Sequence, residues 1–508
     1  MPVDANKDDL LIGVSGAGAM GRGIVQVAAA GGVNVRLFDI NADQCKEAVD
    51  FIGKMLGRAA DKGRMAQEDA DAAMGRIEVV ADVKEFAPCD IVIEAATENL
   101  EIKKKIFAQL EEVVREDAII ATNTSSLSVT TIASACSRPQ RVAGFHFFNP
   151  VPLMRLVEVI EGVLTEEWVG DALMILGKRM TREPVRVKDA PGFLVNQVGR
   201  GYNIESQHIQ HECVADYVDI DRILRDAAGF RMGPFELLDL TALDVTHPAT
   251  ELIYNQFYQE ARYRPSSVMR ARLEAGMLGR KVGRGYYVYE DGKQIVPEEA
   301  SAPSYDGRPV WISKAEAEGH DKLAEIVRAC DGKLDTGDTP GANSLILVTP
   351  IGEDISTTAA AQGLDPARTL GVDTLVGLAT RRTVMTNPAT EAEYRNAAHG
   401  LLSNDGVPAT VIRDCPGFIG QRIISMICNI GCQIAQFGTA TPDDIDKAVV
   451  LGLNYPNGPL KFGEVLGASN VLRILDALYR FYGDPRYRPS PWLRRRAMLG
   501  LSLFKTEI

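Results

Sequence analysis

The chain has 508 residues, 46% of them hydrophobic and 24% charged, with a formal net charge of −13 and a pI near 5.2. This length exceeds what one hydrophobic core usually organises, so two to four domains are expected. The acidic balance argues against general nucleic-acid binding and against an anionic membrane surface, but it leaves room for an anionic ligand held by local amide dipoles.

The eight cysteines are scattered and include no Cys-x-x-Cys pair. The first nine residues are polar and acidic, and no stretch approaches the roughly 20 apolar residues of a membrane span. The sequence therefore predicts free thiols in a reducing compartment, a cytoplasmic protein and no membrane partner.

A nucleotide-binding pattern opens the chain. Residues 10–14 predict a short buried strand and residues 24–29 a helix, and between them lie Gly16, Gly18 and Gly21. Glycines at this spacing allow a tight turn and close approach of the backbone to a pyrophosphate at the helix N-terminus. With a strand before it and a helix after it, the pattern predicts a dinucleotide site.

Asp39 ends the second predicted strand, 33–38, and lies 18 residues after Gly21. Its carboxylate is expected to accept hydrogen bonds from the adenosine ribose and to repel a 2′-phosphate, which favours NAD over NADP. Short apolar strands follow at 90–94 and 118–122, so the fold class is α/β, a Rossmann-like doubly wound NAD-binding domain.

Residues 41–73 predict a helical stretch that carries several basic residues, including Lys62. Two interpretations remain open from the residues alone: a solvated helix pair, or a basic clamp for an anionic ligand.

Residues 141–160 predict two short apolar strands joined by a proline-containing turn. They carry His146 and Glu158, twelve residues apart, which the bend can bring into hydrogen-bond range. A buried carboxylate on one ring nitrogen fixes the tautomer and raises the basicity of the other, which produces a general base. Taken alone, such a pair is more often a core histidine beside a surface glutamate, and it is the rest of the chain that favours the general base.

Read together, four motifs resemble the 3-hydroxyacyl-CoA dehydrogenases and span most of residues 10–290. They are the glycine loop with Asp39; Glu94-Ala-Ala-Thr-Glu98-Asn-Leu-Glu-Ile-Lys103; Asn123-Thr-Ser125 followed by His146-Phe-Phe-Asn149-Pro; and Asp189-Ala-Pro-Gly-Phe-Leu-Val-Asn196. The last hundred residues resemble the longer bacterial members, which act on 3-hydroxybutyryl-CoA or, in phenylacetate breakdown, on 3-hydroxyadipyl-CoA.

The resemblance implies oxidation of a (3S)-3-hydroxyacyl-CoA thioester to the 3-oxoacyl-CoA, in fatty-acid or aromatic catabolism. His146 would take the hydroxyl proton and Glu158 would balance the resulting imidazolium, while Ser125 and Asn196 would orient the substrate. Glu98, Lys103 and Asn149 match residues that line the cofactor site in the family. Lys62 matches a basic residue near the CoA phosphates.

Two other functions are compatible with this scaffold. One is a binding or structural protein like the related lens crystallins, against which the joint presence of the four catalytic residue types argues. The other is a different β-hydroxyacid dehydrogenase, but those typically use a lysine in place of the histidine–glutamate pair. Singly, Ser125 and Asn196 could also be helix caps.

The chain contains an internal repeat. Val187-Lys-Asp-Ala-Pro-Gly-Phe193 recurs as Ile412-Arg-Asp-Cys-Pro-Gly-Phe418, and the same offset relates further positions without a gap. Each copy predicts helices, so the all-helical domain is duplicated. Asn196 falls on Gln421, and no glycine loop opens the second half, so we expect one active site in the chain.

The expected domains are an NAD-binding domain (1–189), a first helical domain for substrate and dimerisation (190–290), a linker (291–340), a degenerate α/β remnant (341–410) and a second helical domain (411–508). Because the family dimerises through its helical domain, we expect either a homodimer or a monomer with an internal pseudo-dimer.

The residues give no metal site: His208, His211 and Cys213 have ligand-like types but lie on one predicted helix without a second ligand pair. Acyl chain length is open, and so is whether the acyl tail carries a second carboxylate. Arg155 or Arg200 could bind such a carboxylate or merely face solvent.

Overall fold

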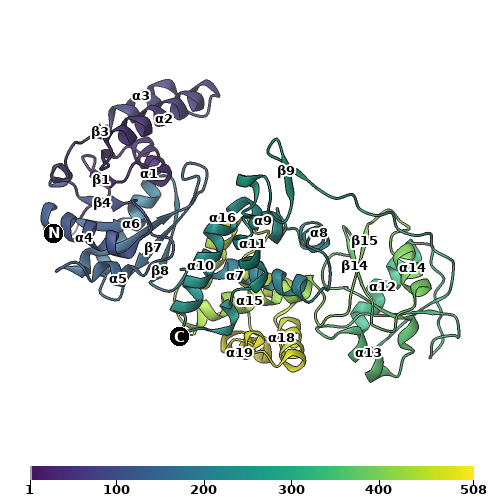
Figure 1. Cartoon of the computed structure of the whole chain (residues 1–508). Helices are drawn as coiled ribbons and strands as arrows, with labels where there is room; N and C mark the ends of the chain where they lie inside the picture. The colour runs from purple at the N-terminus through teal and green to yellow at the C-terminus, as the bar shows by residue number, and fades with distance from the viewer. Residues whose placement is uncertain (1–2, 508) are drawn as a thin grey trace. The chain divides into compact units, whose positions relative to one another are not determined.

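The computed structural model describes residues 3–507, which fall into two compact units. The first comprises the described residues up to Gln197 together with Phe437–Leu453, and the second comprises Val198–Gln436 together with the chain from Asn454 onward. Each unit contains one principal β-sheet with helices around it (Figure 1).

Within the described residues, the first unit is built on an eight-stranded sheet of order β3-β2-β1-β4-β5-β6-β7-β8. The strands are β1 (Leu11–Ser15), β2 (Asn34–Phe38), β3 (Ile77–Val79), β4 (Ile91–Glu94), β5 (Ile119–Thr122), β6 (Val142–Phe147), β7 (Leu156–Glu161) and β8 (Glu183–Lys188). All neighbours are parallel except β6 and β7. The doubly wound α/β prediction is confirmed, as is the antiparallel pair around the proline-containing turn.

The helices of this unit are α1 (Ala19–Ala30), α2 (Ala42–Asp61), α3 (Gln67–Gly75), α4 (Leu100–Val113), α5 (Val129–Ala133), α6 (Glu167–Arg179) and α16 (Pro442–Leu453). Strands β4 and β5 are wholly buried, because helices cover a parallel sheet on both faces. The predicted helical stretch 41–73 is the pair α2 and α3, which pack side by side (Figure 1).

Helix α16 comes from the second copy of the repeat but packs against β7 and β8 of the first unit. A Cβ on Gly452 would lie 2.8 Å from the Val195 side chain and 2.9 Å from that of Leu156, so only glycine allows this approach. The Lys188 amide also donates to the Thr439 carbonyl at 2.8 Å. The second copy thus completes the first α/β unit with one of its own helices.

The second unit contains a five-stranded sheet of order β11-β12-β13-β14-β15, again counted over the described chain. The strands are β11 (Val310–Ile312), β12 (Leu345–Val348), β13 (Thr369–Val372), β14 (Arg382–Met385) and β15 (Ala409–Ile412), and β9 (Val288–Glu290) pairs with β10 (Lys293–Ile295) in a separate hairpin. Within the five-stranded sheet, β13 and β14 are antiparallel and the other neighbouring strands are parallel. This is the pattern of β4 to β8, so the remnant keeps that half of the fold without counterparts of β1 to β3.

The helices of the second unit are α7 (Val195–His211), whose first residues belong to the first unit, α8 (Tyr217–Arg222), α9 (Pro234–Thr241), α10 (Leu243–Gln256), α11 (Ser267–Glu274), α12 (Ala317–Ala329), α13 (Ile355–Gln362), α14 (Ala392–Leu401), α15 (Gly420–Gln436), α17 (Pro459–Leu466), α18 (Ala468–Tyr482) and α19 (Pro491–Leu499). The predicted linker 291–340 is too long, because β11 and α12 lie inside it. Strand β11 is wholly buried and α12 buries one face, but β11 is too short to stand out among the surrounding charged and proline residues.

The two copies of the Pro-Gly-Phe motif have the same local structure. In both, the aspartate before it accepts hydrogen bonds from the start of a neighbouring helix: Asp189 from the Thr130 amide at 2.8 Å, and Asp414 from the Ile355 amide at 2.8 Å. The phenylalanines that end the two motifs, Phe193 and Phe418, both have a positive φ, of 50° and 46°. The repeat in the sequence is therefore a repeat in structure.

A buried ionic cluster joins α7 to α15 in the second unit. The Arg422 guanidinium, fully buried, donates to Glu205 at 2.6 Å and to Glu212 at 2.8 and 2.9 Å, and Tyr487 donates its phenol proton to Glu205 at 2.7 Å. Burial acts to raise the pKa of Glu205, but the charges of Arg486 and Arg422 outweigh it and lower that pKa to about 2. The two equivalent helices of the repeat are thus held together by charges that must remain paired.

Candidate active site

His146 and Glu158 lie directly opposite each other on the antiparallel strands β6 and β7. His146 Nδ1 lies 2.6 Å from Glu158 Oε2, and the two residues are 5% and 0% exposed. Because a carboxylate can only accept, Nδ1 donates, and the lone pair of the neutral ring is then on Nε2. The imidazole also packs against the rings of Phe148 and Phe193, with centroids at 4.4 and 5.8 Å.

The other oxygen of Glu158 is held by the backbone. Its Oε1 accepts hydrogen bonds from the amides of Leu194 and Val195, both at 3.1 Å, at the start of α7. A helix N-terminus stabilises negative charge, so these two amides orient and stabilise the Glu158 side chain in an otherwise apolar surrounding. The same contact fixes α7, and with it Asn196, beside the histidine–glutamate pair.

Asn196 and Ser125 are brought together. The Asn196 side-chain amide donates to the Ser125 carbonyl at 3.1 Å. Ser125 lies in the turn after β5, at the carboxyl end of a parallel strand, where ligands bind in doubly wound folds. The structure therefore places all four predicted catalytic residues in the first unit and around the start of α7, with the Ser125 hydroxyl partly exposed.

Glu98 organises the turn that carries Ser125. Its Oε1 accepts from the Ser125 amide at 2.9 Å, the Ser126 amide at 3.1 Å and the Thr124 hydroxyl at 2.7 Å. Burial acts to raise the pKa of Glu98, but the charge of Lys103 and these hydrogen bonds lower it. Glu98 is therefore an anion that shapes the loop expected beside the cofactor.

Lys103 is buried, with 1% exposure, and its ammonium group contacts both oxygens of Glu94, at 2.8 and 2.9 Å. Its distance to Glu98 is 3.5 Å. Lys103 thus reaches the cofactor region through Glu98 and does not present a free cation. The sequence analysis does not predict Glu94 as a site residue. Its position at the end of β4, paired with Ser15 at the end of β1, could have indicated that it lies at the cofactor edge of the sheet.

The glycine loop fits a dinucleotide. Gly16 has a φ of +115°, and a Cβ on Gly21 would lie 1.8 Å from the Gly16 carbonyl oxygen. Gly18 is the N-cap of α1 and has open space around its Cα. No side-chain hydrogen bond caps the helix, so the first-turn amides are available to a pyrophosphate. Asp39, at the end of β2, accepts from the Ala17 amide at 2.8 Å and so ties its carboxylate to the loop.

Two predicted residues are exposed and form no hydrogen bond or ion pair with this cluster within residues 3–507. Lys62 is an exposed residue at the C-cap of α2, and Asn149 is exposed in the turn after β6. Of the candidate tail readers, Arg155 is a surface residue paired with Glu183 at 2.6 Å, whereas Arg200 is buried and donates to the hydroxyl of Thr250.

The second unit carries no equivalent base. In the second sheet Gly371 pairs with Met385, and in the first sheet Gly144 pairs with Ile160 in the same way. His146 lies two residues after Gly144, so Asp373, two residues after Gly371, stands at the corresponding position. The Gln421 side chain, the counterpart of Asn196, donates to Asp373 Oδ1 at 3.0 Å, and burial raises the pKa of Asp373 to about 6. A fully buried carboxyl–amide pair therefore fills this place.

No helix in residues 3–507 combines the length and apolar character needed to cross a membrane. Over the same residues, no three His, Cys, Asp or Glu side chains gather into a possible metal site. His208 is instead part of the ionic surroundings of Arg422, and burial lowers its pKa to about 4.

Comparisons with known proteins point to one family. The family model for the 3-hydroxyacyl-CoA dehydrogenase NAD binding domain matches residues 11–190, and that for the 3-hydroxyacyl-CoA dehydrogenase C-terminal domain matches twice, at residues 192–289 and 417–505. The 3-hydroxyadipyl-CoA dehydrogenase of Escherichia coli K12 is 38% identical over 491 residues, covering 96% of this chain and 97% of that protein. A probable 3-hydroxybutyryl-CoA dehydrogenase of Bacillus subtilis is 39% identical over 278 residues, covering 55% of this chain and 96% of that protein.

Among solved structures, a 3-hydroxybutyryl-CoA dehydrogenase from Escherichia coli K12 superimposes with a TM-score of 0.85 at 35% identity, covering 97% of this chain and 98% of that one. The double match of the C-terminal model agrees with the duplicated helical domain. The chain belongs to the 3-hydroxyacyl-CoA dehydrogenase family and is an NAD-dependent dehydrogenase.

Proposed function

We propose that this enzyme interconverts (3S)-3-hydroxyacyl-CoA and 3-oxoacyl-CoA, with 3-hydroxyadipyl-CoA as the leading substrate and 3-hydroxybutyryl-CoA as the second candidate. The observation that carries the reaction is the His146–Glu158 pair, a buried imidazole whose Nδ1 is held 2.6 Å from a carboxylate. The adipyl substrate is supported by the relative that matches 96% of the chain, and the butyryl substrate by the structural neighbour with the TM-score of 0.85.

Bound NAD supplies the acceptor for the hydride that leaves C3. The residues of the chain handle the proton and the geometry. His146 Nε2 accepts the proton of the 3-hydroxyl, and Glu158 stabilises the imidazolium that results, without taking the proton itself. The side-chain amide of Asn196 and the hydroxyl of Ser125 orient the substrate oxygen, as dipoles that need no change of protonation.

The roles of the remaining residues are part of the same proposal. Asp39 binds the adenosine ribose, the loop of Gly16, Gly18 and Gly21 binds the pyrophosphate, and the turn held by Glu98 and Lys103 lies beside the cofactor together with Asn149. Lys62, at the exposed end of α2, meets the CoA phosphates.

We also propose that the chain acts in the cytoplasm as a monomer with an internal pseudo-dimer. The packing of α16 against β7 and β8, and the Arg422 cluster between α7 and α15, support it because both use the duplicated helical domain within one chain. Light scattering after gel filtration tests this: a mass of two chains would instead favour the homodimer.

The test of the reaction is NADH oxidation with acetoacetyl-CoA and with 3-oxoadipyl-CoA, each repeated with NADPH. Turnover with NADH and little with NADPH is expected, and the ratio of kcat/KM for the two thioesters ranks the substrates. If neither thioester is reduced although NADH binds, the short-chain and dicarboxylic proposals fail, and longer acyl groups or a crystallin-like binding protein become the leading alternatives.

A further inference from the structure

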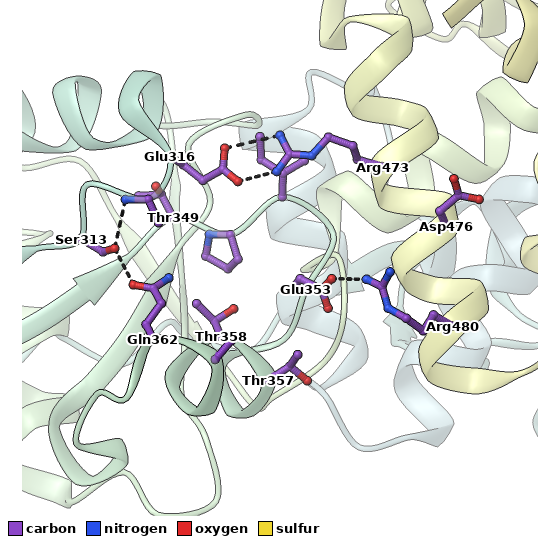
Figure 2. A pocket seen from close by; sticks show the side chains of 14 residues that line it. Ser313, Glu316, Thr349, Glu353, Thr357, Thr358, Gln362, Arg473, Asp476 and Arg480 are labelled. Atoms are coloured by element: carbon purple, nitrogen blue, oxygen red, sulfur yellow. Dashed lines mark hydrogen bonds and ion pairs between the residues drawn. The ribbon is translucent and has the colours of Figure 1, made fainter. Parts of the chain in front are cut away.

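A pocket in the second unit lies where the first unit has its catalytic turn. Its volume is about 400 Å³, and it opens at the carboxyl ends of β11 and β12 (Figure 2). By strand register, Ser313 stands at the position of Glu94 and Thr349 at that of Asn123. The smaller serine in place of a glutamate provides room at a strand edge where doubly wound folds bind ligands.

Two arginines of α18 line the pocket from the helical side. Arg473 pairs with Glu316, with Nη1 3.4 Å from Oε2, and Arg480 pairs with Glu353 (Figure 2). Being seven residues apart, they leave the helix on one face, about 10 Å apart along its axis. Their counterparts in the first copy of the repeat, Pro248 and Asn255, carry no charge, so this pair of cations belongs to the second copy alone.

Both ion pairs are accessible to a competing ligand. The side chains of Arg473 and Arg480 are 49% and 67% exposed, and those of Glu316 and Glu353 are 29% and 31% exposed. Ion pairs at this exposure contribute little to stability, so either glutamate can move into solvent at small cost. Guanidinium groups bind carboxylates in a bidentate manner, which makes a ligand with two carboxylates the natural replacement.

The pocket also contains hydrogen-bonding capacity that the protein does not use. Thr349 is 3% exposed, and its hydroxyl has no hydrogen-bond partner among residues 3–507. A buried hydroxyl without a partner is costly, so it marks a place where a ligand or water would be stabilised. Thr357 and Thr358, in the first turn of α13, line the same wall (Figure 2).

We propose that this pocket is a binding site for a small dicarboxylate, whose two carboxylates replace Glu316 and Glu353 as partners of Arg473 and Arg480. The site binds its ligand without chemistry, because Asp373 and Gln421 occupy the places of the base and the orienting amide. The two glutamates hold the arginines in the absence of ligand. This binding is independent of the dehydrogenase reaction and of the choice of its acyl substrate.

The test is calorimetric titration of the full-length protein with adipate, with hexanoate as the monocarboxylate of equal chain length. Adipate is expected to bind at least tenfold more tightly than hexanoate. R473Q and R480Q should each weaken adipate binding at least tenfold, whereas R395Q, an exposed arginine of α14 outside the pocket, should leave it unchanged. E353Q should tighten binding because it removes a competing carboxylate.

Thermal unfolding and acetoacetyl-CoA reduction by the same variants show that each is folded. Adipate that fails to bind the wild-type protein overturns the proposal. So does binding that R473Q and R480Q leave unchanged, since the ligand would then lie elsewhere, for example in the acyl site. Equal affinity for adipate and hexanoate also overturns it, because one of the two carboxylates would be unused.

Discussion

Replacing Glu158 by glutamine separates the charge of this residue from its shape. The carboxylate now accepts from His146 Nδ1 through one oxygen and from the amides of Leu194 and Val195 through the other. Glutamine has a single acceptor oxygen, so one of these two donor sets must face an NH2 group. The variant therefore loses the charge that balances the imidazolium and also a hydrogen bond that orients either the ring or α7.

The size of the effect follows from the burial of the pair, 5% and 0% exposed. A hydrogen bond to a charged group contributes about 1.5–3 kcal/mol, and about 1.4 kcal/mol corresponds to a tenfold change in rate. E158Q should therefore lower kcat for acetoacetyl-CoA reduction by roughly 10- to 150-fold. The Kd for NADH, measured by fluorescence titration, should stay within about twofold, because Glu158 does not reach the glycine loop.

The matched control is E183Q on the neighbouring strand β8, where the glutamate forms a surface pair with Arg155. Its kcat should equal that of the wild type, since exposed ion pairs contribute little. If E158Q kept a kcat within about threefold of the wild type, the carboxylate would not be supporting the base, and the assignment of the pair would be wrong.

Three further outcomes are expected. H146Q should lower kcat by orders of magnitude with NADH binding nearly intact; lost NADH binding would contradict the assigned role. Asp39→Ala should raise the KM for NADH and narrow the preference over NADPH in the same assay, whereas an unchanged ratio would remove Asp39 from the ribose site. R422M removes the guanidinium that hydrogen-bonds to the buried Glu205 carboxylate and should lower the urea-measured free energy of unfolding by about 3–5 kcal/mol. Because Arg486 and Arg422 lower the folded pKa of Glu205 to about 2, its contribution to stability is present above its ordinary pKa of 4.5 and is lost as pH falls toward 2. This contribution should be smaller in the acid unfolding curve of the variant.

Much of the first half could be predicted from local signals. The glycine loop, the strand before it and Asp39 form a contiguous pattern because each residue acts on its immediate neighbours in the chain. The contact of His146 with Glu158 could be anticipated because a short turn fixes the register of an antiparallel pair. The duplicated helical domain was visible because the repeat has no gap across its span.

Other features depended on contacts between distant segments. The extent of the remnant was misjudged because β11 is three residues long and is stabilised only by pairing with β12. Likewise, the sequence offset of the repeat would match His146 to Gly371. The strand register between β13 and β14 instead places Asp373, two residues further along, at the position of His146.

The sequence by itself determined the family pattern, the catalytic residue types and the duplication, since these rest on motifs whose members are close together or recur at one spacing. Only the tertiary structure decided that Lys103 is buried against Glu94 and that α16, from the second copy of the repeat, completes the first unit. It also decided that two arginines of α18 line the pocket of the second unit. Burial and pairing of charge depend on which surfaces meet in the folded chain, and local patterning does not specify that.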